Sequence, residues 1–292
     1  MLRKGDLTQG GITGTLLHFT LPMMVGSFLQ QCYNIADTLI VGQCIGAGAL
    51  AAVGSAYTLM VFLISVLLGL AMGSGTVFSL HYGAGNHVAL RRSIFSSFVL
   101  IGIVTLILNV AVFIWLGPIL RLLQVPQDIY GMMRSYLWII FCGIVFTFIY
   151  NFYASLLRAV GDSVTPLWFL AVSVVLNIAL DLFFILQLDW GIQGAAAATV
   201  LAQGVAALGI IIYTYRRRPE LRWHHEDMCF DRTCLKEIAS FSTLTCVQQS
   251  VMNLGILMVQ GLVNSFGTAV MAAFAAAVKI DSFAYMPVQE FG

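Results

Sequence analysis

The chain has 292 residues, of which 60% are hydrophobic and only 9% are charged. A soluble domain carries about 25% charged residues, so this chain has too few charges to cover the surface of one or two soluble domains. The formal net charge of +1 does not point to nucleic acid, which is not expected as a partner. The composition predicts an all-α polytopic membrane protein.

Long runs without Asp, Glu, Lys or Arg predict the membrane helices, because a helix needs about 20 apolar residues to cross the hydrocarbon. Glycine, proline and charged residues mark the breaks between them. In chain order, the expected helices are Thr15–Ala36, Ala49–Phe78, Ser93–Leu116, Tyr130–Tyr153, Pro166–Gln187, Ile192–Tyr215 and Ala239–Val263, and an eighth begins near Thr268.

The chain is expected to divide into two units. The first six helices form an N-terminal lobe, residues 1–236, with a basic cytoplasmic loop at 216–236. Residues 237–292 form the start of a second lobe, and a faint repeat supports it, since Gln30-Gln31 has a counterpart in Gln248-Gln249. Repeated halves are typical of transporters, and two six-helix halves would need roughly 450 residues. The sequence is therefore expected to be a C-terminally truncated part of a longer chain.

The basic residues predict the orientation, because cytoplasmic loops carry an excess of Lys and Arg. With the N-terminus in the cytoplasm, eleven of the 14 Lys and Arg residues fall on the cytoplasmic side. Only Arg121 and Arg134 fall outside, and Lys279 lies in the last helix. The protein is expected to be a monomer in the plasma (inner) membrane, and Arg216-Arg217-Arg218 is expected to touch anionic lipid.

Two acids coincide with predicted helices, where ionisable groups are costly and usually functional. Asp37 ends the first helix, and Asp181 lies well inside the fifth. Asn177 precedes Asp181 by four residues, so both lie on one helix face. Thr199 lies in the alanine-rich sixth helix, one turn after Ala195.

A carboxyl group at membrane depth either takes up a proton or binds a cation, and a second carboxyl group nearby favours proton uptake. With amide, hydroxyl and carbonyl oxygens beside it, the same cluster could hold Na⁺. Because the same oxygens serve H⁺ and Na⁺, both ions are candidates. The plainer alternatives are a structural hydrogen bond for Asp181 and a structural role at the membrane interface for Asp37.

Pro22 lies in the middle of the first helix, where proline removes a backbone hydrogen bond and kinks the helix. The kink is either fixed or a hinge that responds to protonation of Asp37. Gly69 and Gly73 have the spacing of small residues at a close helix contact. The sequence has no nucleophile–base pair, so no enzyme, no cofactor and no metal beyond Na⁺ are expected.

Several stretches in a fixed order resemble the multidrug and toxic compound extrusion (MATE) family. They are Pro22, Gln30–Gly54, Tyr82–Asn86, Leu157–Asp162, Pro166, Asn177 and Asp181. The resemblance implies twelve helices in two six-helix lobes, and export of amphipathic or cationic compounds driven by inward H⁺ or Na⁺. It also implies a list of site residues: a cation site at Asp37, Asn177, Asp181, Thr199 and the carbonyl of Ala195, a bending position at Pro22, and substrate contacts at Gln30 and Asn151.

The sequence departs from the family pattern in the seventh helix, Ala239–Val263, which has no acid for the second cation site found in some members. The nearest rival function is a lipid-linked precursor flippase of related architecture. Flippases tend to show cationic residues inside the cavity, and the first six helices contain almost none apart from Arg134 near a helix end. This difference favours the antiporter; a membrane-embedded enzyme and a channel are more distant alternatives.

Overall fold

The computed structural model describes residues 12–223, 227 and 232–291, and the regular structure within these ranges is helical. A π-helical turn, η1 (Phe183–Gln187), extends α6, and a 3-10 turn, η2 (Pro219–Leu221), follows α7. The α-helices are α1 (Ile12–Cys44), α2 (Ala47–Gly83), α3 (His87–Leu122), α4 (Gln127–Cys142), α5 (Ile144–Ala159), α6 (Val164–Leu182), α7 (Gly191–Arg217), α8 (Arg232–Asn264) and α9 (Thr268–Phe291).

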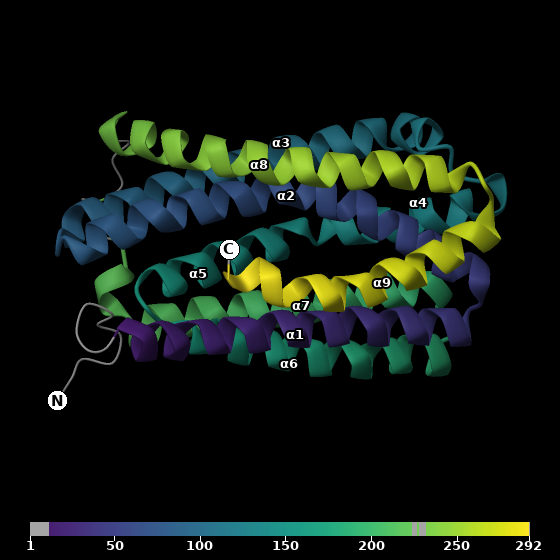
Figure 1. Ribbon diagram of the computed structural model, residues 1–292, viewed down its shortest axis with the longest axis horizontal. Coiled ribbons are helices and arrows are strands. Elements are labelled where there is room, and N and C mark those ends of the chain that lie inside the picture. The colour runs from purple at the N-terminus through teal and green to yellow at the C-terminus, as the bar shows by residue number, and fades with distance from the viewer. Residues whose placement is uncertain (1–11, 224–226, 228–231, 292) are drawn as a thin grey trace.

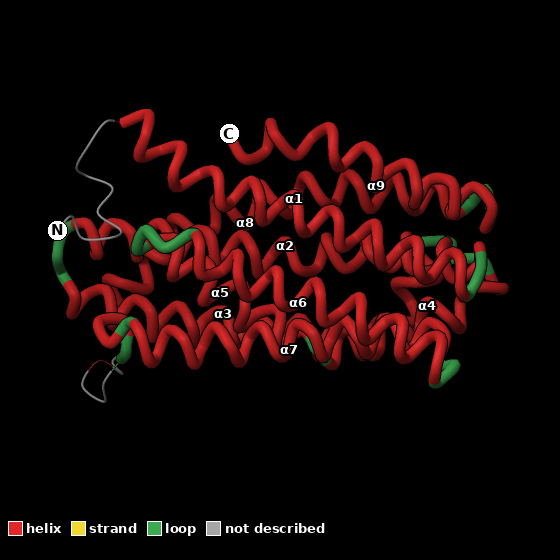
Figure 2. Tube along the Cα trace, turned by 90° about the horizontal axis from the view of Figure 1, so that it is seen from below, coloured by secondary structure: helices red, strands yellow, loops and turns green. Residues whose placement is uncertain are grey.

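The long helices run side by side along the longest axis of the molecule, and most connections lie at the two ends of the bundle (Figures 1 and 2). The α2–α3 and α5–α6 connections and the segment after α7 lie at one end, on the left in Figure 1. We call this the basic end, because Arg91, Arg92, Arg158, Arg216, Arg217, Arg218 and Arg222 belong to it. Arg121 and Arg134 belong to the opposite end, as the predicted alternation of loops requires.

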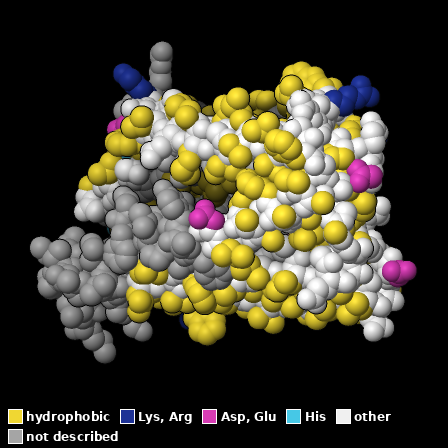
Figure 3. Space-filling model, turned by 45° about the vertical axis from the view of Figure 1, so that its right-hand side comes forward, with side chains coloured by type: hydrophobic (Ala, Val, Ile, Leu, Met, Phe, Trp, Pro, Cys, Tyr) yellow, Lys and Arg dark blue, Asp and Glu magenta, His cyan; other side chains and the backbone are white. Residues whose placement is uncertain are grey.

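Five described helices are long and apolar enough to cross a membrane, and there are six when the bent pair α4–α5 counts as one span. α1 is not among these, and α9 contributes the shorter apolar stretch Thr268–Val278. Many large apolar side chains are exposed, and hydrophobic side chains are spread over the described part of the face in Figure 3, with few charged side chains among them. Lipid contact explains such a surface. The predicted all-helical, multi-pass membrane architecture is confirmed.

Two short sequence stretches form the turns that start α3 and α6. Gly85 has a φ of 69° and Gly161 a φ of 85°, a backbone conformation that glycine adopts without strain. The Asn86 side chain then accepts a hydrogen bond from the Ala89 backbone N–H at 3.1 Å and caps α3. Asp162 accepts from the Thr165 backbone N–H at 3.0 Å at the start of α6.

The prediction of one helix over Tyr130–Tyr153 was wrong, because the chain breaks at Gly143 into α4 and α5, which are bent by 50° relative to each other. A Cβ atom at Gly143 would lie 2.5 Å from Cγ2 of Val200 in α7. The absence of a side chain at Gly143 therefore allows α7 to approach the bend, and this contact joins residues far apart in the sequence.

α1 is longer than predicted. It continues past Ala36 to Cys44, and Gly46, with a φ of 115°, forms the turn into α2. Asp37 therefore lies inside the helix and not at its end, which weakens the alternative of a purely interfacial role. The helix also continues through Pro22.

α2 packs more extensively against α8 than any other pair of described helices does. A Cβ atom at Gly73 would lie 2.4 Å from the Cα atom of Ser242, and one at Gly69 would lie 2.4 Å from the Cα atom of Cys246. This confirms that the glycine spacing serves close helix packing. α8 and α9 thus contact the preceding helices, and the boundary predicted near residue 236 stays a prediction.

Candidate functional site

Asp37 of α1 and Asp181 of α6 meet inside the bundle. Their exposed fractions are 8% and 0%, so neither faces the acyl chains. The carboxyl group of Asp181 lies within electrostatic reach of that of Asp37. The structure therefore brings the two predicted acids together inside the bundle.

Asn177 and Thr199 connect this acid pair to α7. In one orientation of the Asn177 amide, its nitrogen donates to Oδ2 of Asp181 at 2.9 Å. Its oxygen then accepts from the backbone N–H of Thr199 at 3.1 Å and from the Thr199 hydroxyl at 3.3 Å. Turned by 180°, the amide nitrogen donates to Oγ1 of Thr199 at 3.3 Å instead. An ionised Asp181 only accepts hydrogen bonds, so it favours the first orientation.

Two tyrosines that the sequence analysis did not single out also adjoin the acid pair. The Tyr33 hydroxyl lies 3.3 Å from Oγ1 of Thr199, and Tyr33 is within electrostatic reach of Asp37 and Asp181. Tyr136 of α4, only 5% exposed, is within reach of the same two acids. The sequence held one hint, since Tyr33 precedes Asp37 by four residues and so shares its helix face.

An open pocket of about 530 Å³ lies beside the acid pair, between α1, α5, α6 and α7. It contains both predicted substrate contacts, Gln30 and Asn151, and two predicted cation ligands, Asn177 and Thr199. Its lining presents amides, hydroxyls and tyrosine rings but no charged side chain. The full lining is Gln30, Tyr33, Thr147, Tyr150, Asn151, Leu170, Ser173, Val174, Asn177, Thr199, Ala202, Gln203 and Ala206.

Besides the two acids, two further predicted residues, Ala195 and Pro22, lie outside the pocket lining. Ala195 is 1% exposed and lies one turn before Thr199 on α7. Pro22 lies fifteen positions before Asp37 on α1, which corresponds to about 22 Å along the helix. The cation-ligand role of Ala195 and the hinge role of Pro22 stay predictions.

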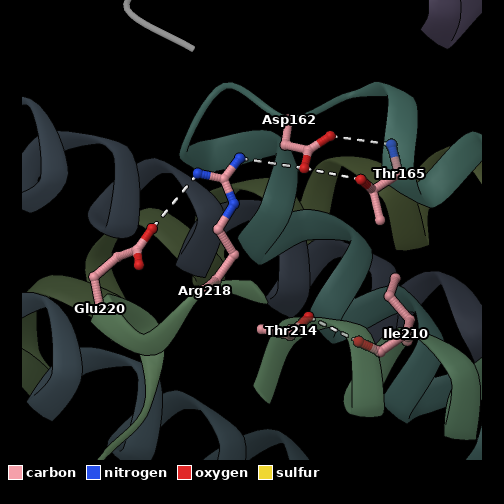
Figure 4. Close-up of polar contacts among 6 residues, drawn as sticks. All are labelled: Asp162, Thr165, Ile210, Thr214, Arg218 and Glu220. Carbon is pink, nitrogen blue, oxygen red and sulfur yellow. Dashed lines mark hydrogen bonds and ion pairs between the residues drawn. The ribbon is translucent and has the colours of Figure 1, made fainter. Parts of the chain in front are cut away.

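A second polar cluster lies at the basic end, around Arg218 at the end of α7 (Figure 4). Arg218 lies 3.3 Å from Oδ2 of Asp162 and 3.5 Å from Oε1 of Glu220. Burial lowers the pKa of Arg218, but the hydrogen bonds and charges of the two acids outweigh burial and leave the pKa above its ordinary value. Asp162 also accepts from the hydroxyl of Thr165 at 2.9 Å, so it joins the start of α6 to the end of α7.

The fold and the site together define a class of protein, the polytopic helical membrane proteins with a buried acid pair beside a polar pocket. The family model described as MatE matches residues 22–183, which is more than half of the chain. The chain belongs to the MatE family, and the resemblance drawn from the sequence is confirmed.

Two relatives from Bacillus subtilis (strain 168) are similar over most of this chain. "Probable multidrug resistance protein YpnP" is 32% identical over 298 residues, which cover 100% of this chain and 65% of the relative. "Probable multidrug resistance protein YoeA" is 28% identical over 94% of this chain and 61% of its own length. The chain therefore spans less than two thirds of the length of these relatives.

Solved structures support the fold independently. An outward-facing MATE family transporter of the MOP superfamily superposes with a TM-score of 0.88 at 23% identity, over 99% of this chain and 64% of that chain. A mutant of the Vibrio cholerae MATE transporter VcmN superposes with a TM-score of 0.82 at 26% identity, over 94% of this chain and 62% of that chain.

Proposed function

We propose that the chain serves a cation-coupled antiporter that exports amphipathic or cationic compounds across the plasma membrane, with the N-terminus in the cytoplasm. The coupling ion, H⁺ or Na⁺, binds at Asp37 and Asp181, and the exported compound binds in the pocket beside them. The relatives named as multidrug resistance proteins and the family membership support transport of small molecules.

One observation carries the coupling proposal: Asn177, a residue of the pocket lining, also contacts the acid pair. Asn177 and Thr199 line the pocket, and Asn177 also donates to Asp181 in one orientation of its amide. An ion at Asp181 therefore changes the hydrogen bonding of a residue that a compound in the pocket touches. Coupling between two sites requires such a differential interaction with the two states.

The Asn177 amide gives this coupling a concrete form. With Asp181 ionised, the amide nitrogen donates to the carboxylate, and its oxygen is occupied by Thr199. With Asp181 protonated and donating, the amide turns so that its oxygen accepts from Asp181 and its nitrogen donates to Thr199. The polar group that Asn177 offers to the pocket thus depends on the charge of Asp181.

The rival function, a lipid-linked precursor flippase, is disfavoured by the pocket. A pyrophosphate carries several negative charges, which arginine and lysine side chains bind well. The lining contains no Lys or Arg, and its amides and tyrosine rings suit an uncharged or cationic compound better.

A binding experiment on the purified chain tests the proposal. The probe is ethidium, an amphipathic cation, and its dissociation constant is measured by fluorescence while Na⁺ is raised or the pH is lowered. We expect ion loading to weaken ethidium binding by a factor within the usual range of coupling, about 5- to 150-fold. Asp181→Asn keeps the shape of the side chain but cannot ionise, so the ion dependence should vanish.

Asp128→Asn provides the matched control, because Asp128 is exposed at the start of α4 and lies outside the pocket lining. This variant should keep the ion dependence of the wild type. If Asp181→Asn bound ethidium with the same dependence on both ions as the wild type, the acid pair would have no part in coupling.

A further inference from the structure

The end of α7 and the segment after it carry three arginines with exposed side chains, Arg216, Arg217 and Arg222. We propose that these arginines form a binding site for the headgroup of an anionic phospholipid. The proposal depends on the membrane location of the bundle and not on the transport function.

Among the acids that the structure describes at the basic end, each already has a basic partner other than Arg216, Arg217 and Arg222. The partners lie between 2.7 and 3.5 Å apart. The pairs are Arg91 with Asp227, Arg218 with Asp162 and Glu220, and His81 with Glu237. The surplus positive charge at this end therefore attracts anions from outside the described chain.

Within the described part of the chain, the Nε of Arg222 donates to the backbone carbonyl of Tyr215. This contact orients the side chain, and a carbonyl group carries no net charge to neutralise the guanidinium. Arg216 and Arg222 therefore lie near the same turn of α7, because Tyr215 is the neighbour of Arg216.

The exposed apolar residues of α7 show which face of this helix contacts lipid. They are Leu201, Val205, Leu208 and Ile212, with exposed fractions between 47% and 57%. Their spacing of four, three and four residues follows a single helix face. The next position on that face is Arg216, so its guanidinium group continues the lipid-facing stripe to the level of the headgroups.

A tryptophan on the neighbouring helix lies close to this level. Trp168 of α6 is 68% exposed. The adjacent residue Phe169 contacts Tyr213 of α7, with ring centroids 6.1 Å apart. Trp168 is therefore about one turn deeper than Arg217, where tryptophan rings commonly lie against the glycerol region of a lipid. One lipid molecule could contact both features, with its phosphate at the exposed arginines and its acyl chains along the apolar face of α7.

The test compares lipid binding by the purified chain and its variants in mixed micelles, using native mass spectrometry. The ligands are phosphatidylglycerol and the net-neutral phosphatidylcholine. We expect the wild type to prefer phosphatidylglycerol. A basic residue near a membrane surface contributes about 5-fold in affinity for anionic lipid, so Arg216→Gln with Arg217→Gln should weaken phosphatidylglycerol binding about 30-fold.

Two matched variants define the specificity of the result. Arg121→Gln with Arg134→Gln removes two exposed arginines at the opposite end and should leave binding unchanged. Arg216→Lys with Arg217→Lys keeps the charge and should retain most of the binding. Equal weakening in the two glutamine variants, or none in either, would overturn the site. Displacement of the lipid by inorganic phosphate, beyond the effect of sodium chloride at the same ionic strength, would show a free-anion site and overturn the lipid assignment.

Discussion

Replacing Asn264 with leucine should destabilise the contact between α2 and α8. Asn264 is 1% exposed and donates to the backbone carbonyl of Leu123 at 2.8 Å. Its oxygen accepts from the Gln260 amide at 2.8 Å and from the Ser55 hydroxyl at 3.2 Å. Thr58 donates to the Gln260 oxygen at 3.2 Å, so the cluster connects α2, α8 and the end of α3.

The expected loss follows from the groups that leucine leaves without a partner. A hydrogen bond between membrane helices contributes about 0.6 kcal/mol on average, and three such bonds sum to roughly 2 kcal/mol. The Leu123 carbonyl accounts for the largest part of the lost free energy, because a buried acceptor without a partner costs about 1–3 kcal/mol. Ser55 accounts for the smallest part, since a helical serine can donate to the carbonyl four residues earlier. We expect the free energy of unfolding to fall by about 2 kcal/mol.

Reversible unfolding in mixed detergent micelles, followed by circular dichroism, measures this change. Gln248→Leu is the control, because Gln248 is exposed on the same helix and should tolerate leucine. A double-mutant cycle with Ser55→Ala isolates the bond to Asn264. The reasoning is refuted if Asn264→Leu changes the free energy of unfolding by no more than Gln248→Leu does.

Two further substitutions test other contacts by the same unfolding assay. Gly73→Ala should lower the free energy of unfolding by about 1–3 kcal/mol, because the new Cβ atom would lie 2.4 Å from the Cα atom of Ser242. Gly83→Ala is the control and should be nearly neutral, because a Cβ atom there meets nothing within 4 Å. Equal effects of the two would contradict the close contact. Asp162→Asn should lower the free energy of unfolding by less than about 1 kcal/mol. Asparagine can still accept from the Thr165 backbone N–H and can donate to the Thr165 hydroxyl, so the main loss is the partly exposed ion pair with Arg218. The loss of unfolding free energy caused by Asp162→Asn should shrink at high salt, because salt screens the ion pair. A loss that grew with salt would exclude an ionic origin.

The sequence was sufficient for the architecture because its main determinants are local. A run of about 20 apolar residues predicts a spanning helix wherever it occurs, and turns with glycine and a capping side chain, such as Gly85-Asn86, end one helix and start the next. The break at Gly143 could not be predicted this way. Glycine is common in straight membrane helices, and the contact that requires glycine at the bend is with Val200, which is distant in the sequence.

The sequence predicted the acids of the candidate site but not the tyrosines around them, because an acid is recognised locally and a tyrosine only through packing. An acid such as Asp181 inside an apolar helix stands out in the sequence, because burying a charge is costly. Tyr33 and Tyr136 do not stand out, since tyrosines are frequent near membrane interfaces. The spacing of four residues to Asp37 hints at Tyr33, but only the packing of α4 against the acid pair reveals that Tyr136 belongs to its surroundings.

The charge of the compound in the pocket decides the sign of the proposed coupling. A neutral compound displaces water from the wall formed by Asn177 and Thr199, which makes an ionised acid pair less favourable and promotes ion loading. A cationic compound adds an attraction to the ionised pair that opposes loading. At a separation on the order of 8 Å and an effective dielectric constant of about 20, that attraction is about 2 kcal/mol, or roughly 30-fold in affinity. Exchange of a compound for an ion requires this second case, so a permanent cation should compete with H⁺ or Na⁺ where a neutral compound of the same shape should not.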